Sequence, residues 1–560
     1  MTNTKKTEGS NNRNKVVVIG LDGGTYTVLD PLMESGRMPN LARLIKKGVR
    51  GDLISTIPPV TGPAWTSFMT GKGPGGHGLF DFVKPAADGY SREIINFTHI
   101  RSQTIWSILS DAGYKVGVVG VPVTYPPPEV NGFVVSGMLT PGIDANYTYP
   151  TELADEIKEK FGEYVLDIWW QHYNPGQEEY LLDALLKCAR QRWQVSLHLM
   201  KTRPCDVFMT VFMATDRIHH SVWHFLCPEG ELDERGKRLR EKAYEIYEEI
   251  DKGIGELVAA AGEDTNFLLM SDHGFGPLNG KFSVNTWLSQ IGLLSCEGWR
   301  QSAVRTREKV SGTVKWWLQK LDPLGFRKVL RRILLKSPAR MKAYSFLNYV
   351  DWSKTKAYSA SNTESGIYIN LKGREPQGVV EPGQEAEELQ AFIVKKLKEL
   401  RHPKTGEPLV NRLYTREDIY KGPFVEKSPD VIFFLNDGEY IADVQLNPEL
   451  FQPISWKTGS GTHRLEGFFV GSGPYIKDGL ELDSPNIIDL APTILGLMDV
   501  PIPSDMEGRV LETMLTEEFH AGHELVHVEA DAAMAMGPTK EFSQDEAERV
   551  EEQLKDLGYL

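Results

Sequence analysis

The sequence predicts an α/β fold built on a doubly wound, mostly parallel β-sheet with helices on both faces and an inserted helical cap. Short apolar, β-branched runs such as VVVIGL and NFLLM alternate along the chain with longer segments of helical periodicity. Strands that helices bury on both faces are typical of parallel sheets. The chain has 560 residues, 41% of them hydrophobic, which is enough for a large domain with insertions. A strongly basic stretch separates the two strand-rich halves and predicts the cap.

The order of the elements follows from these patterns. We expect strands at 16–21, 115–121, 132–138, 206–213, 266–270 and 430–435. We expect helices at 38–48, 63–70, 151–161, 178–200, 232–260, 384–400 and 487–498. Ligands of doubly wound folds bind outside the carboxyl ends of the strands, so the residues that follow each apolar run are the candidates for a functional site.

Composition divides the chain into four expected segments. Residues 1–15 are expected to be a disordered leader, 16–290 and 346–515 a catalytic domain, 291–345 a basic helical cap, and 516–560 an acidic helical tail. Within the tail, Ser543 precedes Glu546 by three residues, which predicts a capping box at the start of a helix. The terminal LGYL sequence is expected to have no catalytic role.

Cellular location is inferred from what the sequence lacks. The polar N-terminus has no apolar signal-peptide core, and no run of about 18 apolar residues predicts a membrane-spanning helix. The four cysteines form no CxxC pair, and free thiols are typical of a reducing compartment. We therefore expect a cytoplasmic protein.

The net charge limits the classes of binding partner that the sequence predicts. The net charge of −14 argues against nucleic acid as a partner, but a metal site would still attract a small phosphorylated substrate. The stretch 300–342 is the exception, because its thirteen Lys or Arg residues against Glu308 and Asp322 give a net charge of +11. It also carries tryptophan and leucine, as interfacial helices do. A membrane-surface or polyanion-binding protein that uses 300–342 is therefore an alternative function.

Candidate metal ligands follow the apolar runs. Asp22 comes directly after VVVIGL, and FMATDRIHH places Asp216 and His220 four residues apart, on one face of a helix. His219 competes with His220 as a ligand. FLLMSDHGFG places Asp272 and His273 together at a strand end, where the glycines permit a bend.

A sixth candidate ligand is His463, in the glycine-rich sequence KTGSGTHRLEG. Together the clusters supply three Asp and three His side chains, a mixture of oxygen and nitrogen ligands that suits Zn²⁺, with Mn²⁺ as the alternative. Two divalent metal ions with three ligands each would keep the open positions that catalysis requires.

The candidate nucleophile is Thr61, within STIPPVTGPAWTSFMTGKG. The predicted helix at 63–70 places its hydroxyl at a helix N-terminus, where backbone N–H groups and the helix dipole favour an anion. A hydroxyl beside a divalent metal loses its proton more easily and becomes a nucleophile. Ser55, Thr56, Thr66 and Ser67 compete with Thr61 on chemistry alone.

These motifs, in this order, resemble the alkaline phosphatase superfamily, specifically its type I phosphodiesterase/nucleotide pyrophosphatase branch and the predicted phosphohydrolases or phosphomutases of bacteria and archaea. The resemblance covers about 16–290 and 348–510, and it places the nucleophile of the family on Thr61, ahead of TGKGPGGHG. It favours His220 over His219. It implies that one metal is held by Asp22, Thr61, Asp272 and His273, and the other by Asp216, His220 and His463.

One departure limits what the resemblance implies about the substrate. Nucleotide pyrophosphatases of this branch carry an Asn shortly after the H-G that contacts a phosphoryl oxygen, whereas this chain reads HGLFDF, with Asp81 and Phe82. Nucleotide specificity is therefore not carried over. We expect Arg217 to bind the substrate, since a guanidinium suits a monoester or a pyrophosphate; a structural ion pair is its alternative role.

The expected function is hydrolysis of a small phosphate ester, with nucleotide, lipid-linked and sugar-linked esters as candidate substrates. Attack by Thr61 would give a phospho-threonine intermediate that water then releases. A phosphomutase that uses the same metals is an alternative, because a cap that excludes water would favour return of the phosphoryl group to the substrate.

Overall fold

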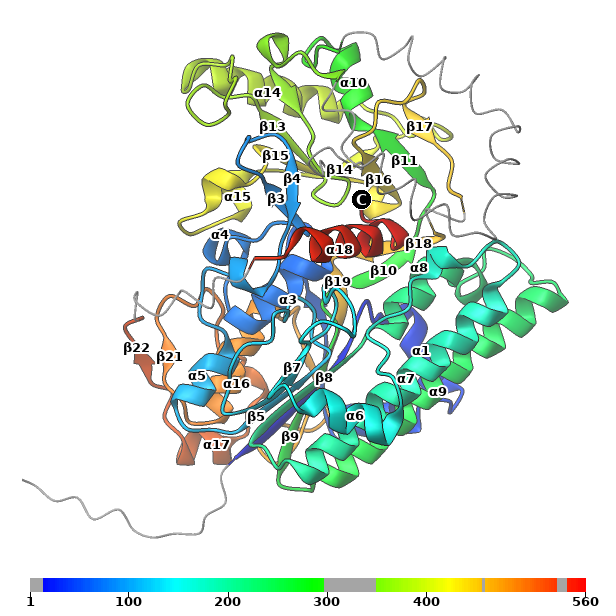
Figure 1. Ribbon diagram of the computed structural model, residues 1–560, viewed down its shortest axis with the longest axis vertical. Helices are drawn as coiled ribbons and strands as arrows, with labels where there is room; N and C mark the ends of the chain where they lie inside the picture. Colours follow the sequence, from blue (N-terminus) through cyan, green and yellow to red (C-terminus); the bar gives the residue numbers. More distant parts are fainter. Residues whose placement is uncertain (1–13, 297–348, 456–458, 531–540) are drawn as a thin grey trace, which may run out of the picture.

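The computed structural model describes residues 14–296, 349–455, 459–530 and 541–560. The basic stretch 300–342, most of the expected cap and most of the expected leader lie outside these residues. Within them, the chain forms two main sheets, and Figure 1 shows the larger sheet with its helices below the smaller one.

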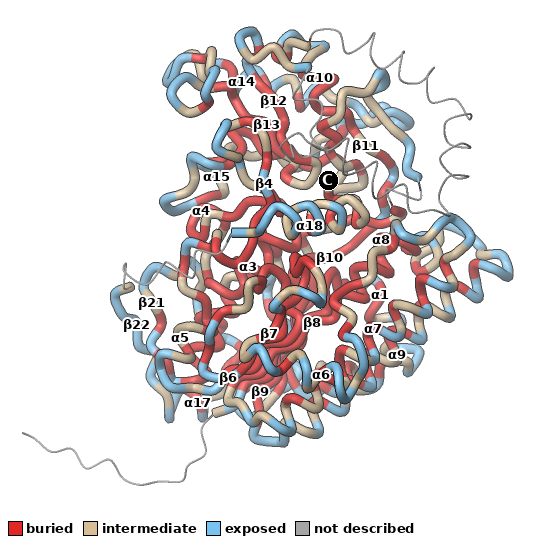
Figure 2. Tube along the Cα trace, viewed as in Figure 1, coloured by how far each residue is buried: buried red, intermediate tan, exposed pale blue. Residues whose placement is uncertain are grey.

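The larger sheet has nine strands in the order β20-β2-β19-β9-β1-β8-β5-β6-β7. All neighbouring pairs run parallel except those that β19 and β7 make, which confirms the mostly parallel sheet. The strands are β1 (Lys15–Leu21), β2 (Gly48–Ile54), β5 (Val116–Val119), β6 (Gly132–Val135), β7 (Thr148–Tyr149), β8 (Val207–Phe212), β9 (Thr265–Met270), β19 (Glu466–Ser472) and β20 (Leu480–Leu482). β1, β8 and β9 are buried almost throughout, because helices cover both faces (Figure 2).

Helices cover the larger sheet on both sides, as expected for a doubly wound fold (Figure 1). On one side α3, α5 and α16 pack against one another, and on the other α7 packs along α9. The helices around this sheet are α1 (Tyr26–Glu34), α2 (Pro39–Lys46), α3 (Thr61–Thr70), α4 (Pro74–His77), α5 (Ile105–Asp111), α6 (Leu153–Phe161), α7 (Glu178–Thr202), α8 (Ala214–Leu226), α9 (Glu234–Ala261), α16 (Leu490–Leu497) and α17 (Glu517–Gly522). The expected helices agree with these bounds to within a few residues.

A second sheet was not predicted. Its order is β12-β13-β15-β16-β11-β17, with β14 beside β15. Its strands are β11 (Gly280–Ser283), β12 (Ala357–Tyr358), β13 (Gly366–Ile369), β14 (Val410–Thr415), β15 (Val431–Leu435), β16 (Tyr440–Asp443) and β17 (Phe451–Gln452), accompanied by α10 (Val284–Gln290), α14 (Gln384–Lys398) and α15 (Arg416–Ile419). The expected strand at 430–435 exists as β15, but it pairs antiparallel with β13, β14 and β16 in this sheet rather than joining the parallel one. A fully buried apolar run has the same pattern in either setting, so the sequence could not assign its sheet.

A two-stranded ribbon links the two sheets. β10 (Gly274–Pro277) follows β9 directly and pairs antiparallel with β18 (Gly461–Arg464), which leads into β19. The register places Phe275 opposite His463. The ribbon therefore brings a histidine from late in the chain to the carboxyl end of the central strands.

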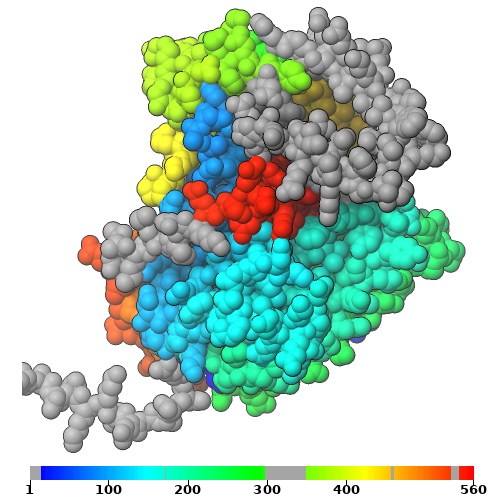
Figure 3. Space-filling view, viewed as in Figure 1, coloured from blue at the N-terminus to red at the C-terminus, as the bar shows by residue number. Residues whose placement is uncertain are grey.

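The remaining described elements are two short ribbons and the final helix. The ribbons are β3 (Val83–Pro85) with β4 (Arg92–Ile94), and β21 (Ile502–Pro503) with β22 (His527–Val528). α18 (Gln544–Asp556) begins with the expected capping box of Ser543 and Glu546, and it lies across the middle of the face shown in Figure 3, in red. Among the described residues, no helix is both long and apolar enough to span a membrane.

Candidate metal centre and nucleophile

Three carboxylates meet at one edge of the larger sheet. Asp22 follows β1, Asp272 lies two residues after β9, and Asp216 is in the first turn of α8, which follows β8. These strands are parallel neighbours, so their carboxyl ends lie at the same edge. All three side chains are fully buried there.

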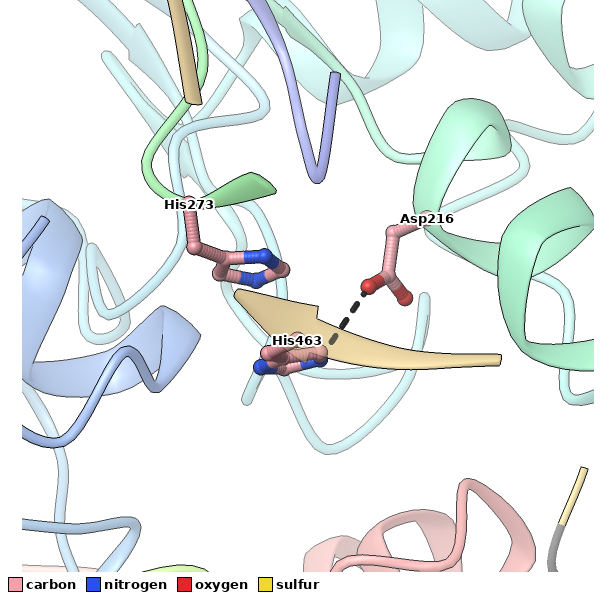
Figure 4. Close-up of side chains that lie close together, drawn as sticks. All are labelled: Asp216, His273 and His463. Carbon is pink, nitrogen blue, oxygen red and sulfur yellow. Dashed lines mark ion pairs between the residues drawn. The ribbon is translucent and has the colours of Figure 1, made fainter. Parts of the chain in front are cut away.

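Asp216, His220 and His463 form the first cluster. Asp216 Oδ1 lies 3.4 Å from Nε2 of each histidine, and the two Nε2 atoms are 3.0 Å apart. Ligands of a tetrahedral Zn²⁺ at about 2.0–2.1 Å stand about 3.3 Å from one another, so three donor atoms at these distances fit one ion. Figure 4 shows Asp216 and His463 facing each other from α8 and β18.

Backbone carbonyls orient both histidines of this cluster. His220 Nδ1 lies 3.2 Å from the carbonyl oxygen of Gly461, and His463 Nδ1 lies 2.8 Å from that of Pro59. A carbonyl only accepts hydrogen bonds, so each Nδ1 carries the proton of the neutral ring and each Nε2 presents its lone pair. This is the arrangement that metal-binding histidines use.

The second cluster surrounds His273. Its Nε2 lies 3.4 Å from Asp272 Oδ2, 3.7 Å from Asp22 Oδ1 and 3.3 Å from the hydroxyl oxygen of Thr61. His273 Nδ1 donates to the carbonyl of Gly274, so Nε2 again presents its lone pair. The ring stacks on His463 with centroids 3.6 Å apart, which joins the two clusters (Figure 4).

The three aspartates show where a cation fits. Each has one buried oxygen without a hydrogen-bond partner, namely Asp22 Oδ1, Asp216 Oδ1 and Asp272 Oδ2, and these are the oxygens that face the histidines. The other oxygen of each is held by Trp65 Nε1 at 2.7 Å, by Arg217, or by the Gly23 N–H at 3.1 Å, respectively. A buried carboxylate oxygen without a partner is unfavourable, and divalent cations would satisfy all three. The residues therefore fit a metal centre.

Electrostatics agree with this arrangement. Burial, together with the neighbouring aspartates, raises the pKa of Asp22 and Asp272 well above the ordinary carboxyl value. Burial alone would also raise the pKa of Asp216, but His220, Arg217 and His463 hold it well below the ordinary value. Burial lowers the pKa of His220 to about 3. Its imidazole is therefore neutral at physiological pH, the form that binds metals.

Thr61 is the hydroxyl that faces the clusters. It is the first residue of α3, fully buried, and its side chain makes no capping bond, because the N-cap is Val60. The four competing hydroxyls have hydrogen-bond partners elsewhere: Ser55 bonds to the Asp272 carbonyl, Thr56 to that of Pro58, Thr66 to that of Gly62, and Ser67 to His77. The structure thus distinguishes Thr61 from its neighbours, which chemistry alone did not.

His219 and Arg217 both have structural partners. His219 uses Nδ1 on the Gly23 carbonyl and Nε2 on the Tyr247 hydroxyl, so neither nitrogen faces the clusters. Arg217 is fully buried, and its guanidinium bonds Asp167, Asp216, Tyr559 and Met138. These contacts engage all five N–H groups of the guanidinium, which leaves no donor for a substrate. In this structure Arg217 forms the structural ion pair that was its alternative role.

Two further residues at the site were not predicted. Trp65 lies one helical turn after Thr61 and holds Asp22. Tyr559, in the terminal LGYL sequence, places its hydroxyl 3.4 Å from His220 Nε2. The spacing from Thr61 could have suggested Trp65, but no local pattern connects Tyr559 with residues more than three hundred positions earlier in the chain.

A pocket leads to the centre. Its lining includes Pro59, His220 and His463, residues of the second sheet such as Phe434, and Tyr559, and its volume is about 90 Å³. The second sheet, β18 of the ribbon, the segment before α3 and the end of the chain therefore form its walls.

Comparison with known proteins gives one family. The sequence model of the family described as type I phosphodiesterase/nucleotide pyrophosphatase matches residues 16–463. Comparison with curated protein sequences finds no match.

Solved structures with a similar fold include phosphonoacetate hydrolase from Sinorhizobium meliloti 1021. Its complex with phosphonoformate has a TM-score of 0.53 at 15% identity over 87% of this chain and 96% of that one. Its complex with phosphonoacetate has a TM-score of 0.50 at 14% identity, with the same coverage. Murine ectonucleotide pyrophosphatase/phosphodiesterase 5 in complex with AMP has a TM-score of 0.48 at 11% identity, over 90% of this chain and 100% of that one.

Proposed function

This chain belongs to the type I phosphodiesterase/nucleotide pyrophosphatase family of phosphohydrolases, in the alkaline phosphatase superfamily, and from that membership we propose a metal-dependent phosphoric ester hydrolase that acts through a phospho-threonine intermediate. The observation that carries the proposal is the position of Thr61. Its hydroxyl lies 3.3 Å from His273 Nε2, beside the clusters that the unpartnered oxygens mark as cation sites.

The residues divide the proposed reaction between them. Thr61 Oγ attacks phosphorus in line with the leaving oxygen, and the bond from phosphorus to that oxygen breaks as the phospho-threonine forms. Water then attacks phosphorus on the side opposite Thr61 and releases phosphate or a phosphomonoester. The first-turn N–H groups of α3 have no acceptor within the helix and favour the charge on the equatorial oxygens. When bound, divalent cations would lower the pKa of the Thr61 hydroxyl and of the attacking water.

Two ions are proposed, one for each cluster. Asp22, Asp272, His273 and Thr61 would hold the first, and Asp216, His220 and His463 the second. Zn²⁺ suits the mixture of imidazole and carboxylate ligands, and Mn²⁺ is the alternative. Titration of the chelator-treated protein with each metal, with bound metal counted by elemental analysis, tests both the number and the preference.

The test of the function is hydrolysis of bis-aryl and mono-aryl phosphates, with chelator and after Zn²⁺ or Mn²⁺ is restored. We expect chelation to abolish turnover and metal to restore it. Thr61→Ala should keep its metals and lose at least about 10³-fold in rate, the scale of a lost nucleophile. Thr61→Ser is the matched control, because it keeps a hydroxyl at the same place. Unchanged turnover in Thr61→Ala would refute the nucleophile.

The same assay addresses the substrate class. The ratio of diester to monoester rates reports the preference, and nucleotide, lipid-linked and sugar-linked esters extend the panel. The phosphomutase alternative stays a prediction; isomer formed from a sugar phosphate without release of free phosphate would favour it. The proposed contact of 300–342 with membranes concerns residues that the structure does not describe, and sedimentation with anionic vesicles tests it.

A further inference from the structure

The end of the chain reaches the metal centre. The Tyr559 hydroxyl lies 3.4 Å from His220 Nε2 and 3.5 Å from Arg217 Nη1. The family match ends at residue 463, so this contact comes from a part of the chain that the family motifs do not cover. The phenol oxygen therefore meets a candidate ligand of the cluster of Asp216, His220 and His463.

Aromatic packing fixes the ring of Tyr559. The ring lies against Phe82, with centroids 4.8 Å apart, and meets His220 and His463 edge-on at 5.8 and 5.9 Å. Only 4% of the residue is exposed. Because the ring is held on several sides, the hydroxyl has a defined direction and points at polar atoms of the site.

The segment that carries Tyr559 is docked along its length. Val550, Leu554 and Leu557 of α18 and the following turn are buried against the rest of the protein. At its start, Glu546 accepts from the Tyr125 hydroxyl at 2.7 Å, and farther along Arg549 makes two bonds to Asp144 at 2.7 and 2.8 Å. Figures 1 and 3 show α18 lying across the middle of the molecule, and α18 contacts β4. The C-terminal segment is therefore held in place by apolar packing, hydrogen bonds and an ion pair.

We propose that Tyr559 is a catalytic residue that donates a hydrogen bond to a non-bridging oxygen of the phosphoryl group during its transfer to and from Thr61. The proposal rests on the proposed function. A phosphoryl group transferred to Thr61 Oγ would lie beside the two clusters, and the phenol oxygen lies 3.4 Å from Nε2 of His220, a candidate ligand of one of them. Arg217 has no donor left for this position, and Phe82, over which Tyr559 packs, has none.

The pocket distinguishes this role from a blocking one. Leu557, Gly558 and Tyr559 form one wall of the pocket, and a volume of about 90 Å³ remains between them, His220, His463 and the second sheet. A segment that filled the substrate site would leave no space beside the histidines. The docked segment therefore completes the site and leaves room for a phosphoryl group.

The test is Tyr559→Phe in the full-length, metal-loaded protein. The substitution keeps the ring and removes only the O–H. We expect kcat on an aryl phosphate to fall about 10²-fold with little change in KM, as for the loss of one donor to a transition state. The affinity for orthovanadate, which adopts the transition-state geometry, should fall by a similar factor, and the bound metal should stay the same.

The matched control is Tyr164→Phe. Tyr164 is 3% exposed, its hydroxyl has no hydrogen-bond partner, and it does not line the pocket. This control should leave the rate and the vanadate affinity unchanged. A Tyr559→Phe protein with unchanged rate and vanadate affinity would overturn the proposal, and so would a faster one, which would identify the segment as a plug.

Vanadate binding separates this inference from the proposed function. If the wild-type protein hydrolyses no phosphate ester with any metal, the proposed function fails. The difference in vanadate affinity between Tyr559→Phe and the wild-type protein, measured by calorimetry, would still show whether the phenol contacts a phosphoryl-like oxygen.

Discussion

A buried carboxylate needs partners that stabilise its charge, and both oxygens of Asp216 have such neighbours. One of its oxygens faces the two histidines, and the other accepts from Arg217. Arg217 in turn makes a two-point contact with Asp167, through Nε at 3.2 Å and Nη2 at 2.5 Å. This buried pair fixes the direction of Asp216, so we expect Arg217 and Asp167 to act as positioning residues for the candidate metal cluster.

Removing the guanidinium should therefore destabilise the fold. Arg217→Met preserves much of the volume but leaves two buried carboxylates without their cation. We expect the free energy of unfolding to fall by about 3–5 kcal/mol, the usual cost of breaking a buried ion pair from one side. Urea denaturation monitored by circular dichroism measures it. Arg549→Ala, which removes an exposed pair with Asp144, should cost at most about 1 kcal/mol, and equal losses in the two variants would refute the argument.

Trp65 permits a sharper test of how Asp22 is held. Trp65→Phe removes the N–H that bonds Asp22 Oδ2 at 2.7 Å, so the carboxylate loses its fixed orientation. We expect metal affinity at this cluster to fall about 10- to 100-fold, as for other groups that orient a ligand. Trp106→Phe is the matched control, since Trp106 is also buried and its Nε1 has no hydrogen-bond partner. A competitive chelator titration that gives the same affinity for both variants would contradict this role.

At the residue scale, the sequence revealed side chains with metal-binding chemistry near strand ends. It did not reveal contacts that form only when distant segments pack together. The expected ligands lie within a few residues of strand ends or in a glycine-rich loop, positions that a strand pattern reveals. The structure brings all six together with Thr61. The sequence predicts a substrate contact for Arg217 because its guanidinium lies next to a candidate ligand. Its ion-pair partner Asp167 lies fifty residues earlier, and no sequence pattern connects the two residues. Tyr559 was missed for the same reason.

At the scale of elements, the central strands were predictable and the second sheet was not. β1, β8 and β9 are mostly apolar strands of six or seven residues that are buried almost throughout, a pattern that burial on both faces of a sheet explains. The strands of the second sheet are mostly short, and β11 and β16 pair although about 160 residues separate them. Such pairing depends on contacts distant in sequence, so local periodicity does not record it.

The C-terminal helix offers a prediction at this scale. Leu554 of α18 is fully buried, and its replacement by Ala should weaken the docking of the helix by about 2–5 kcal/mol. Because α18 is a terminal element, the loss should appear as local opening: amide hydrogens of α18 should exchange faster while those of β1 stay protected. Activity should fall together with docking if Tyr559 acts as proposed. Exchange that rises equally in α18 and β1 would show that the helix is not a separate unit.

At the scale of the molecule, the segment after α4 meets the second sheet through buried polar groups. Asp81, which follows α4, accepts from the Thr363 hydroxyl at 2.5 Å, and the next residue, Glu364, accepts from Tyr368 of β13 at 2.9 Å. One oxygen of Asp81 and one of Glu364 have no hydrogen-bond partner, although both residues are buried. Two carboxyl groups this close in the interior cannot both ionise at low cost. We therefore expect the contact between the segment after α4 and the second sheet to depend on protonation.

This contact should make stability depend on pH. Burial, with the nearby Asp81, raises the pKa of Glu364 from its ordinary value of 4.5 to about 7, against the opposing effect of Arg92. The folded state then binds the proton more tightly than the unfolded state, so the stabilisation is complete below pH 4.5 and is lost as the pH rises through about 7. A rise of about two and a half pKa units limits this stabilisation to about 3 kcal/mol. Glu364→Gln keeps an acceptor for Tyr368 and removes the titration. The free energy of unfolding of this variant, relative to that of the wild-type protein, should therefore increase as the pH rises across this range. Urea denaturation at intervals from pH 5 to 8 measures the difference. Glu129→Gln is the control, because Glu129 is exposed. Parallel curves for Glu364→Gln and the wild-type protein would show that Glu364 ionises without loss of stability.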